Sequence, residues 1–178
     1  ADRAGVTPGL IRHYFQTKDD LTRAAYQRLM EQMTQSSTKV LAFAPQDPVA
    51  RLAAFVVASV SPPVLDPVAV GLWAGFLHDV RRDPAMRDVH SATYLVFRDM
   101  LQSLIAALPR NAGPDQLRRD AIACNAVIDG LWLEGSVLPE AFANGEIASI
   151  ALASVGLILQ IDFSDHAPPL VPTLRTDP

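Results

Sequence analysis

Residues 1–18, ADRAGVTPGLIRHYFQTK, decide the fold, because they have the pattern of the second half of a helix-turn-helix. Residues 1–4 are typical of the end of a helix, and Gly5 permits a turn with positive φ. Thr7 followed by Pro8 marks the cap and the first position of a short helix that ends near residue 15. In such a motif the second helix lies in the major groove of DNA with its N-terminal residues toward the bases. The stretch therefore predicts a DNA-reading helix.

The local charge of this segment favours contact with phosphates. From Arg3 to Lys18 it has three basic residues and no acidic residue. The whole chain has a net charge of −4, which excludes binding of nucleic acid through bulk positive charge. Contact with DNA must therefore depend on this patch.

Length and composition indicate one domain with a sizeable core: 178 residues, of which 49% are hydrophobic and 19% charged. The single cysteine, Cys124, excludes an intramolecular disulfide framework and is typical of a reducing compartment. The uncharged stretch 147–161 has 15 residues, fewer than the ~20 that a membrane helix needs. No signal peptide opens the chain, so we expect a cytoplasmic protein. The start without methionine suggests that residues upstream are absent.

Helix start signals recur along the chain, and no segment alternates with the period of a strand, so the predicted fold class is all-α. Asp47-Pro48, Asp66-Pro67 and Asp83-Pro84 each combine a capping residue with a proline at the first helical position. Thr17 with Asp20 is a variant of the capping box. The expected helices cover residues 8–13, 18–43, 48–60, 67–81, 84–108, 115–137 and 146–162.

Apolar stripes on three of these helices bring aromatic and polar side chains together. Small-molecule sites have apolar walls with a few polar groups, so we expect a cavity of at least ~300 Å³ there. Ordinary core packing is the alternative for the aromatic rings. The candidate ligand-binding residues are Trp73, Phe76, His90, Thr93, Tyr94, Phe97, Asn125, Asp129 and Trp132.

Two of these polar groups have two interpretations each. His90 lies on an apolar stripe, where it is either a hydrogen-bonded core histidine or a ligand-binding residue. Asp129 shares a helix face with Asn125 and either braces a helix or dimer interface, or faces a cationic ligand beside Trp132. A carboxylate that faces the cavity favours a quaternary ammonium ligand. A carboxylate engaged elsewhere favours a neutral or hydrophobic one.

The helices 115–137 and 146–162 are apolar on more than one face, and the additional faces carry small residues. A monomer would expose this surface to water, so we expect a homodimer. The predicted interface residues are Ala123, Ala126, Val127, Gly130, Ser149, Ala153 and Gly156.

Motifs for metal or enzyme chemistry are weak. His78, Asp79 and Asp83 lack a convincing ligand spacing, and Gly135-Ser136 lacks the flanking residues of a nucleophile elbow. We therefore expect no metal site, no cofactor and no catalytic residues. A helical ligand-binding or adaptor dimer without DNA binding is the alternative class, followed by an enzyme, which would turn its ligand over.

The segment AGVTPGLIRHYFQTKDDL resembles the end of the DNA-binding motif of the TetR family. The resemblance implies an all-helical homodimeric transcription factor, usually a repressor, that a small ligand releases from double-stranded DNA. It also implies that the first helix of the motif and most of the second precede this chain. The DNA contacts that it implies fall on Thr7, Pro8, Gly9, Arg12, His13, Tyr14 and Lys18, with Tyr14 and Lys18 on phosphates. Arg12 occupies a position that is commonly tyrosine in the family, and an arginine there could read guanine.

The segments GLWAGFLHDVRRDPAMRDVHSATY and NAVIDGLWLEGSVLPEAF resemble the C-terminal domain of BetI-type regulators, the choline-responsive branch of the TetR family. The resemblance covers about residues 70–160 and favours a cationic or small polar effector without identifying choline. For the whole chain we expect three parts. Residues 1–34 are the end of the DNA-binding domain plus a linker helix, 35–163 bind ligand and dimerise, and 164–178 form a mobile proline-rich tail.

Overall fold

The computed structural model describes residues 8–166, and these residues form helices and no extended strand, which confirms the all-α prediction. The α-helices of the described residues are α1 (Pro8–Tyr14), α2 (Lys18–Lys39), α3 (Pro48–Ser59), α4 (Pro67–Arg82), α5 (Pro84–Ala106), α6 (Pro114–Val137) and α7 (Glu146–Leu159). Short 3-10 turns cover Val40–Ala42, Pro139–Ala141 and Ser164–His166. No helix in this part of the chain has the length and apolar character that crossing a membrane requires.

Side-chain caps explain why the helices begin where the sequence predicts. Asp47 accepts a hydrogen bond from the backbone N–H of Ala50 at 2.8 Å, and Asp66 accepts one from Ala69 at 2.8 Å. Each cap satisfies a donor that a helix start leaves without an intrahelical partner. The proline that follows each aspartate has no N–H to satisfy and a φ already suited to a helix.

The ends of α2 and α7 differ most from the sequence prediction. α2 ends at Lys39, and the chain to Ala42 continues as a 3-10 turn. α7 ends at Leu159 because Gln160 takes a left-handed φ of 57°. Within the predicted mobile tail, Ser164–His166 form a 3-10 turn, and residues 167–178 lie outside the described residues, so the mobility of the tail stays a prediction.

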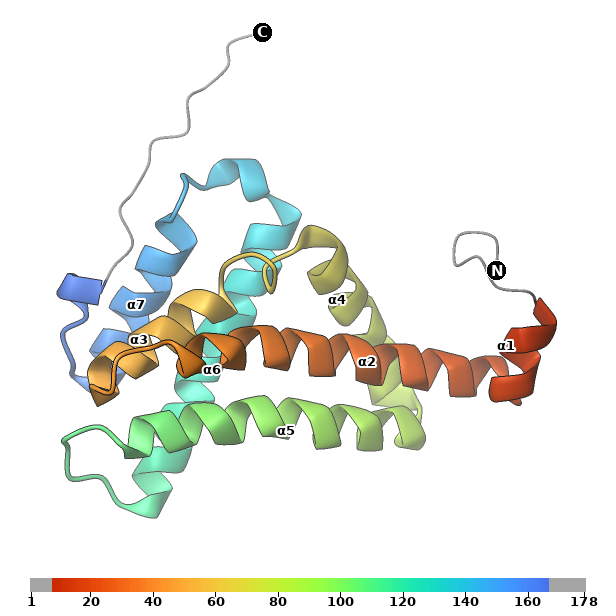
Figure 1. Ribbon diagram of the computed structural model, residues 1–178, viewed down its shortest axis with the longest axis horizontal. Helices are drawn as coiled ribbons and strands as arrows, with labels where there is room; N and C mark the ends of the chain where they lie inside the picture. The colour runs from red at the N-terminus through yellow and green to blue at the C-terminus, as the bar shows by residue number, and fades with distance from the viewer. Residues whose placement is uncertain (1–7, 167–178) are drawn as a thin grey trace, which may run out of the picture.

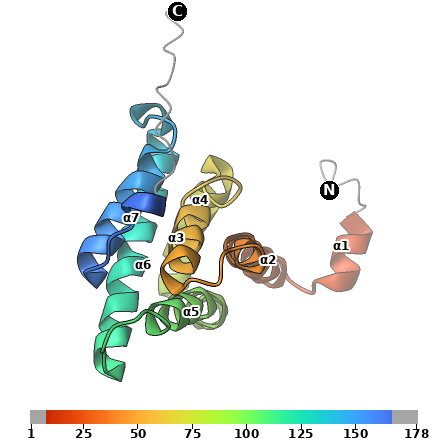
Figure 2. The same ribbon diagram turned by 60° about the vertical axis from the view of Figure 1, so that its left-hand side comes forward.

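The long helices α2 and α5 pack side by side, while α6 packs against α4, α5 and α7 (Figures 1 and 2). α1 lies beyond the far end of α2, away from α6 and α7 (Figure 1). The side chains at the centre are fully buried, among them Tyr26, Leu52, Phe55, Leu101, Ile105, Ile128 and Leu152. The predicted division between residues 34 and 35 falls within α2, so one helix joins the two predicted parts.

Candidate DNA-reading helix and effector site

α1 presents three of the side chains predicted to contact DNA. Arg12, His13 and Tyr14 are exposed, and Tyr14 keeps 71% of its surface accessible. The rings of His13 and Tyr14 meet edge to face with 5.3 Å between their centroids. An exposed arginine, imidazole and phenol on one short helix can donate hydrogen bonds to phosphates and base edges.

The other predicted DNA-contact residues lie at the two ends of this unit. Pro8 begins α1 and the exposed Gly9 follows it, whereas Thr7 lies outside the described residues. Lys18 is exposed at the first position of α2. Contact of any of these residues with DNA stays a prediction.

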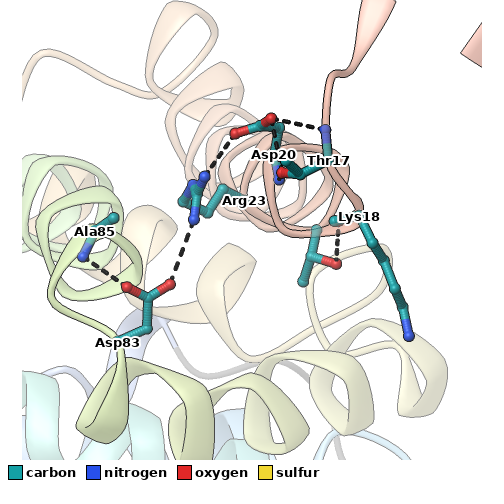
Figure 3. A network of polar contacts seen from close by, with 7 residues as sticks. Thr17, Lys18, Asp20, Arg23, Asp83 and Ala85 are labelled. Atoms are coloured by element: carbon teal, nitrogen blue, oxygen red, sulfur yellow. Dashed lines mark hydrogen bonds and ion pairs between the residues drawn. The ribbon is translucent and has the colours of Figure 1, made fainter. Parts of the chain in front are cut away.

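A capping box fixes the start of α2, directly after α1 (Figure 3). The N–H of Asp20 donates to Oγ1 of Thr17 at 3.0 Å, and the N–H of Thr17 donates to Oδ2 of Asp20 at 2.9 Å. The Thr17 hydroxyl also donates to Oδ2 of Asp20 at 2.7 Å, and this bond first, then the one from the Thr17 N–H, lowers the pKa of the Asp20 carboxyl. The expected capping box is therefore confirmed, and it determines how the chain turns from α1 into α2.

Arg23 extends this junction to the corner between α4 and α5 (Figure 3). Its Nη2 lies 2.6 Å from Oδ1 of Asp20, and its Nη1 lies 3.4 Å from Oδ2 of Asp83. The sequence analysis missed this bridge. The spacing of Asp20 and Arg23 is a signal for an ion pair within a helix. Nothing in the sequence indicates that Asp83, 60 residues further on, completes it.

A second contact joins α2 to α5 in the core. The hydroxyl of Tyr26, a fully buried residue, lies 2.7 Å from Nδ1 of His90. His90 stacks on Tyr94 with 4.8 Å between centroids, and Tyr26 contacts the ring of Phe76 at 5.0 Å. Burial lowers the pKa of His90 and raises the pKa of Tyr26 to about 12. His90 is thus a partly buried histidine that is hydrogen-bonded to Tyr26 in this structure, and a ligand-binding role for it stays a prediction.

Asp129 braces α6 against α5 with one carboxylate oxygen. Its Oδ2 accepts a hydrogen bond from the Tyr94 hydroxyl and a second, 3.0 Å long, from Nδ2 of Asn125. Asn125 Nδ2 also donates to the Tyr94 oxygen. Burial raises the pKa of Asp129 to about 6, and the hydrogen bonds from Tyr94 and Asn125 oppose that rise. The helix-bracing interpretation of Asp129 therefore applies to its Oδ2, the oxygen that joins α6 to α5.

Two tryptophans complete the cluster. Trp73 and Trp132 meet edge to face with 5.5 Å between centroids, and Phe97 lies 6.0 Å from Trp132. The indole N–H of Trp132 donates to the carbonyl of Ser59 at 2.7 Å, which ties α6 to the end of α3. Thr93 is buried, and its hydroxyl donates to the carbonyl of Val89 at 2.9 Å.

The predicted ligand-binding residues therefore come together in one cluster between α4, α5 and α6, with α2 packed on it. Three buried polar atoms in the cluster lack a hydrogen-bond partner among the described residues. They are Trp73 Nε1, Asn125 Oδ1 and Asp129 Oδ1. Because buried polar groups are usually paired, these atoms are candidates for contact with a small molecule.

Surface cavities occur elsewhere. A hollow of about 720 Å³ runs along α7 beside Ala153, Gly156 and Leu157, and one of about 390 Å³ lies beside Gly130 and Val137 on α6. Around the aromatic cluster, by contrast, the rings contact one another directly. The cavity of at least ~300 Å³ expected within the cluster stays a prediction.

The predicted dimer face is only partly open. Ala126, Gly130 and Ala153 are exposed, whereas Ala123, Val127 and Ser149 are partly buried. Gly156 is buried by its own chain, since a Cβ on it would lie 2.7 Å from the carbonyl oxygen of Ile161. The small size of residue 156 is therefore explained by the packing of Ile161 of the same chain against the C-terminal end of α7. The face also has large exposed apolar side chains that the sequence analysis did not name: Leu133, Val137, Leu138, Ile150 and Leu157.

Among the described residues, no group of three or more histidine, cysteine, aspartate or glutamate side chains could hold a metal ion. His78 is exposed and lies 3.3 Å from a guanidinium nitrogen of Arg82. Asp83 serves the corner between α4 and α5, where its Oδ1 accepts from the N–H of Ala85 at 2.9 Å.

Comparison with known proteins relates most of the chain to one family. Residues 48–160 match the model of the C-terminal domain of BetI-type transcriptional repressors. The chain is 28% identical over 160 residues to the HTH-type transcriptional regulator BetI of Paraburkholderia phymatum. It is 29% identical over 160 residues to that of Paraburkholderia xenovorans. Each alignment covers 89% of this chain and 80% of the relative.

Solved structures agree with this relationship. A protein from Pseudomonas aeruginosa PAO1, described as a candidate transcriptional regulator, superposes with a TM-score of 0.78 at 29% identity. The superposition covers 92% of this chain and 78% of that one. A transcriptional regulator from Rhodococcus sp. Rha1 gives a TM-score of 0.74 at 22% identity, over 90% of this chain and 82% of that one, which shows a shared fold.

Proposed function

The chain belongs to the BetI-type family of transcriptional repressors, and on that premise we propose that it is a homodimeric repressor that a small molecule releases from its operator. The family makes it a DNA-binding transcriptional regulator of the TetR type and not an enzyme. We include in the proposal the division predicted from the sequence, with the DNA-contact unit before residue 35 and the effector and dimer region after it. A cytoplasmic location follows from this function.

One observation carries the proposal: an exposed helix with DNA-contact chemistry is joined to the polar cluster of the core by α2. α1 ends at Tyr14, and α2 begins at Lys18. Two turns further along α2, Tyr26 contacts both His90 and Phe76. An effector that shifts α4 or α5 therefore displaces α2 and moves α1.

In this mechanism the effector changes a population rather than pushing the DNA away. The two recognition helices of a dimer must match the spacing of successive major grooves. An effector that binds the released arrangement more tightly than the DNA-bound one lowers operator affinity by the ratio of its two affinities. The buried cluster of rings would have to open to admit it.

We propose that the effector carries an N–H donor or a positive charge. Asn125 Oδ1 and Asp129 Oδ1 are buried acceptors without a partner among the described residues. The faces of Tyr94 and Trp132 offer cation–π contacts nearby. A neutral effector is the alternative, because Asp129 Oδ2 is already engaged by Tyr94 and Asn125.

The DNA part of the proposal is tested with a duplex selected from a random pool by the parent protein. Lys18→Ala should weaken binding to every duplex and flatten its salt dependence, because one phosphate contact is lost. Arg12→Ala should change the preference among duplexes, because it removes a candidate base contact. If both variants bind all duplexes as the parent does, α1 is not the DNA-reading helix.

The effector part is tested by a thermal-shift screen with primary and quaternary amines, fatty acids and neutral aromatics. We expect an amine to raise the Tm of the parent and to lower its affinity for the selected duplex. Asp129→Asn should abolish both effects of that amine. A response to fatty acids or neutral aromatics alone would contradict the assigned effector class.

A further inference from the structure

We propose that Arg23 is a positioning residue for DNA binding: its ion pair with Asp83 holds the start of α2, and with it α1, at a fixed angle to the α4–α5 corner. The inference rests on the proposed function for its consequence on DNA, and on the geometry alone for the order of α1. Neither Arg23 nor Asp83 is among the residues predicted to contact DNA.

The contacts that connect α1 to Asp83 begin at the junction between α1 and α2 (Figure 3). Thr17 and Asp20 exchange backbone-to-side-chain hydrogen bonds of 3.0 and 2.9 Å, so both residues have a fixed geometry at the first turn of α2. The other oxygen of Asp20, Oδ1, lies 2.6 Å from Nη2 of Arg23. The guanidinium is therefore held by the same carboxylate that closes the capping box.

These contacts end at Asp83, whose backbone and side chain are both held by hydrogen bonds. Asp83 follows the last residue of α4 and caps α5, and its N–H donates to the carbonyl of Asp79 at 2.8 Å. Its Oδ1 accepts from the N–H of Ala85 at 2.9 Å, which leaves Oδ2 for Arg23 Nη1 at 3.4 Å. One carboxylate thus joins the corner to α2, and a planar guanidinium with forked donors suits the two-sided bridge.

The exposure of the pair indicates orientation rather than stability as its role. The Arg23 and Asp83 side chains keep 27% and 41% of their surface accessible, and ion pairs this exposed add little to global stability. α1 has only 7 residues and lies beyond the end of α2 (Figure 1). A small gain in freedom at the first turn of α2 therefore becomes a large displacement of the DNA-contact side chains.

The test uses Asp83→Asn and Arg23→Gln in the full-length protein. Asparagine caps a helix as well as aspartate does, so Asp83→Asn removes the charge and keeps the cap of α5. Asp66→Asn is the matched control, since Asp66 caps α4 through Ala69 at 2.8 Å and forms no ion pair with another described residue. Affinity is measured by fluorescence anisotropy with the duplex selected by the parent, and hydrogen exchange reports on residues 9–21.

We expect both variants to bind the duplex about 3- to 10-fold more weakly. This loss corresponds to a fall in the fraction of molecules with α1 in the DNA-binding arrangement to between about a third and a tenth of its value in the parent. The amides of residues 9–21 should exchange faster, while those of α6 and the Tm match the control. The double variant should be no weaker than either single one. Affinity and exchange equal to the control in both variants would overturn the proposal. If the parent binds no duplex, the proposed function fails, and the exchange of residues 9–21 alone decides whether Arg23 positions α1.

Discussion

At the scale of single residues, burial moves two pKa values of the core cluster in opposite directions. It raises the pKa of Asp129 to about 6 and lowers the pKa of His90. Both shifts favour the neutral form, because a charge loses its hydration inside the protein. At neutral pH the cluster therefore contains an ionised carboxylate, with one oxygen unpaired, and a neutral imidazole. Of these two groups, the carboxylate is the one that a cationic partner would stabilise.

Asp129→Asn tests this at the same scale through the pH dependence of stability. The pKa of Asp129 is about 6 in the folded chain, against about 3.9 for an aspartate in an unfolded one. Between those values the folded state holds more protons, so this group lowers the free energy of unfolding as pH rises. His90 acts oppositely, since its lowered pKa reduces stability as pH falls through about 6.5.

Asparagine does not titrate, and His90 is present in both proteins, so the difference in stability between variant and parent isolates the contribution of Asp129. We expect the stability difference between Asp129→Asn and the parent to grow in favour of the variant by about 1 to 3 kcal/mol from pH 4 to pH 6.5. Above that window it should stay constant. Urea unfolding across this pH range is the measurement. Two parallel stability curves would mean that Asp129 ionises as an exposed aspartate does.

At the scale of helices, the sequence predicts starts better than ends or contacts between helices. Starts are local, because Asp47, Asp66 and Asp83 each satisfy a backbone donor two or three residues away. The end of α7 depends on Gln160 adopting a left-handed φ, which its residue type does not signal. The pairing of Arg23 with Asp83 depends on how α2 crosses the α4–α5 corner, and no local pattern contains that crossing.

The candidate site follows the same division. Periodicity alone places the aromatic and polar side chains of α4, α5 and α6 on facing stripes, and they do meet. The partner of His90 could not be predicted, because Tyr26 comes from α2, 64 residues earlier, and reaches it only through tertiary packing. The small-residue stripe of α7 predicts that Gly156 is an interface residue, but such a stripe cannot distinguish a neighbouring copy from the chain's own Ile161 and Phe163.

Gly156→Ala is the prediction that belongs to this scale. The added Cβ would lie 2.7 Å from the Ile161 carbonyl and 3.3 Å from the Phe163 ring, and a backbone carbonyl cannot move aside cheaply. We expect a loss of about 1 to 3 kcal/mol in the free energy of unfolding. Gly71→Ala on α4 is the control, because nothing lies within 4 Å of its added Cβ, and it should be neutral or stabilising by up to ~1 kcal/mol. Equal stability of the two variants would show that the backbone after α7 shifts to accommodate the added Cβ without loss of stability.

At the scale of the whole molecule, α6 and α7 expose apolar surface that a second copy of the chain would cover. Val137 and Leu157 keep 70% and 82% of their surface exposed, next to hollows of about 390 and 720 Å³. A stable protein interface buries about 1,200–2,000 Å² in total around an apolar core, and the exposed Leu133, Val137 and Leu157 side chains supply apolar surface here. A second copy that packs its own α6 and α7 here would also set the spacing of the two α1 helices, because α1 is joined to the same rigid core through α2.

Val137→Glu should therefore convert the proposed dimer to a monomer, because it places a second carboxylate beside Glu134 in the apolar surface that would be buried. Val68→Glu on α4 is a matched control, since Val68 is also 70% exposed but lies off this face, and it should leave the dimer intact. Sedimentation velocity at micromolar concentration distinguishes the two, and circular dichroism checks that both variants stay folded. The monomeric variant should also lose most of its affinity for a two-half-site duplex while keeping weak binding to a single half-site, since each α1 then binds alone. A dimer that survives Val137→Glu but dissociates with Val68→Glu would move the interface to α4 and would require a different spacing of the DNA-reading helices.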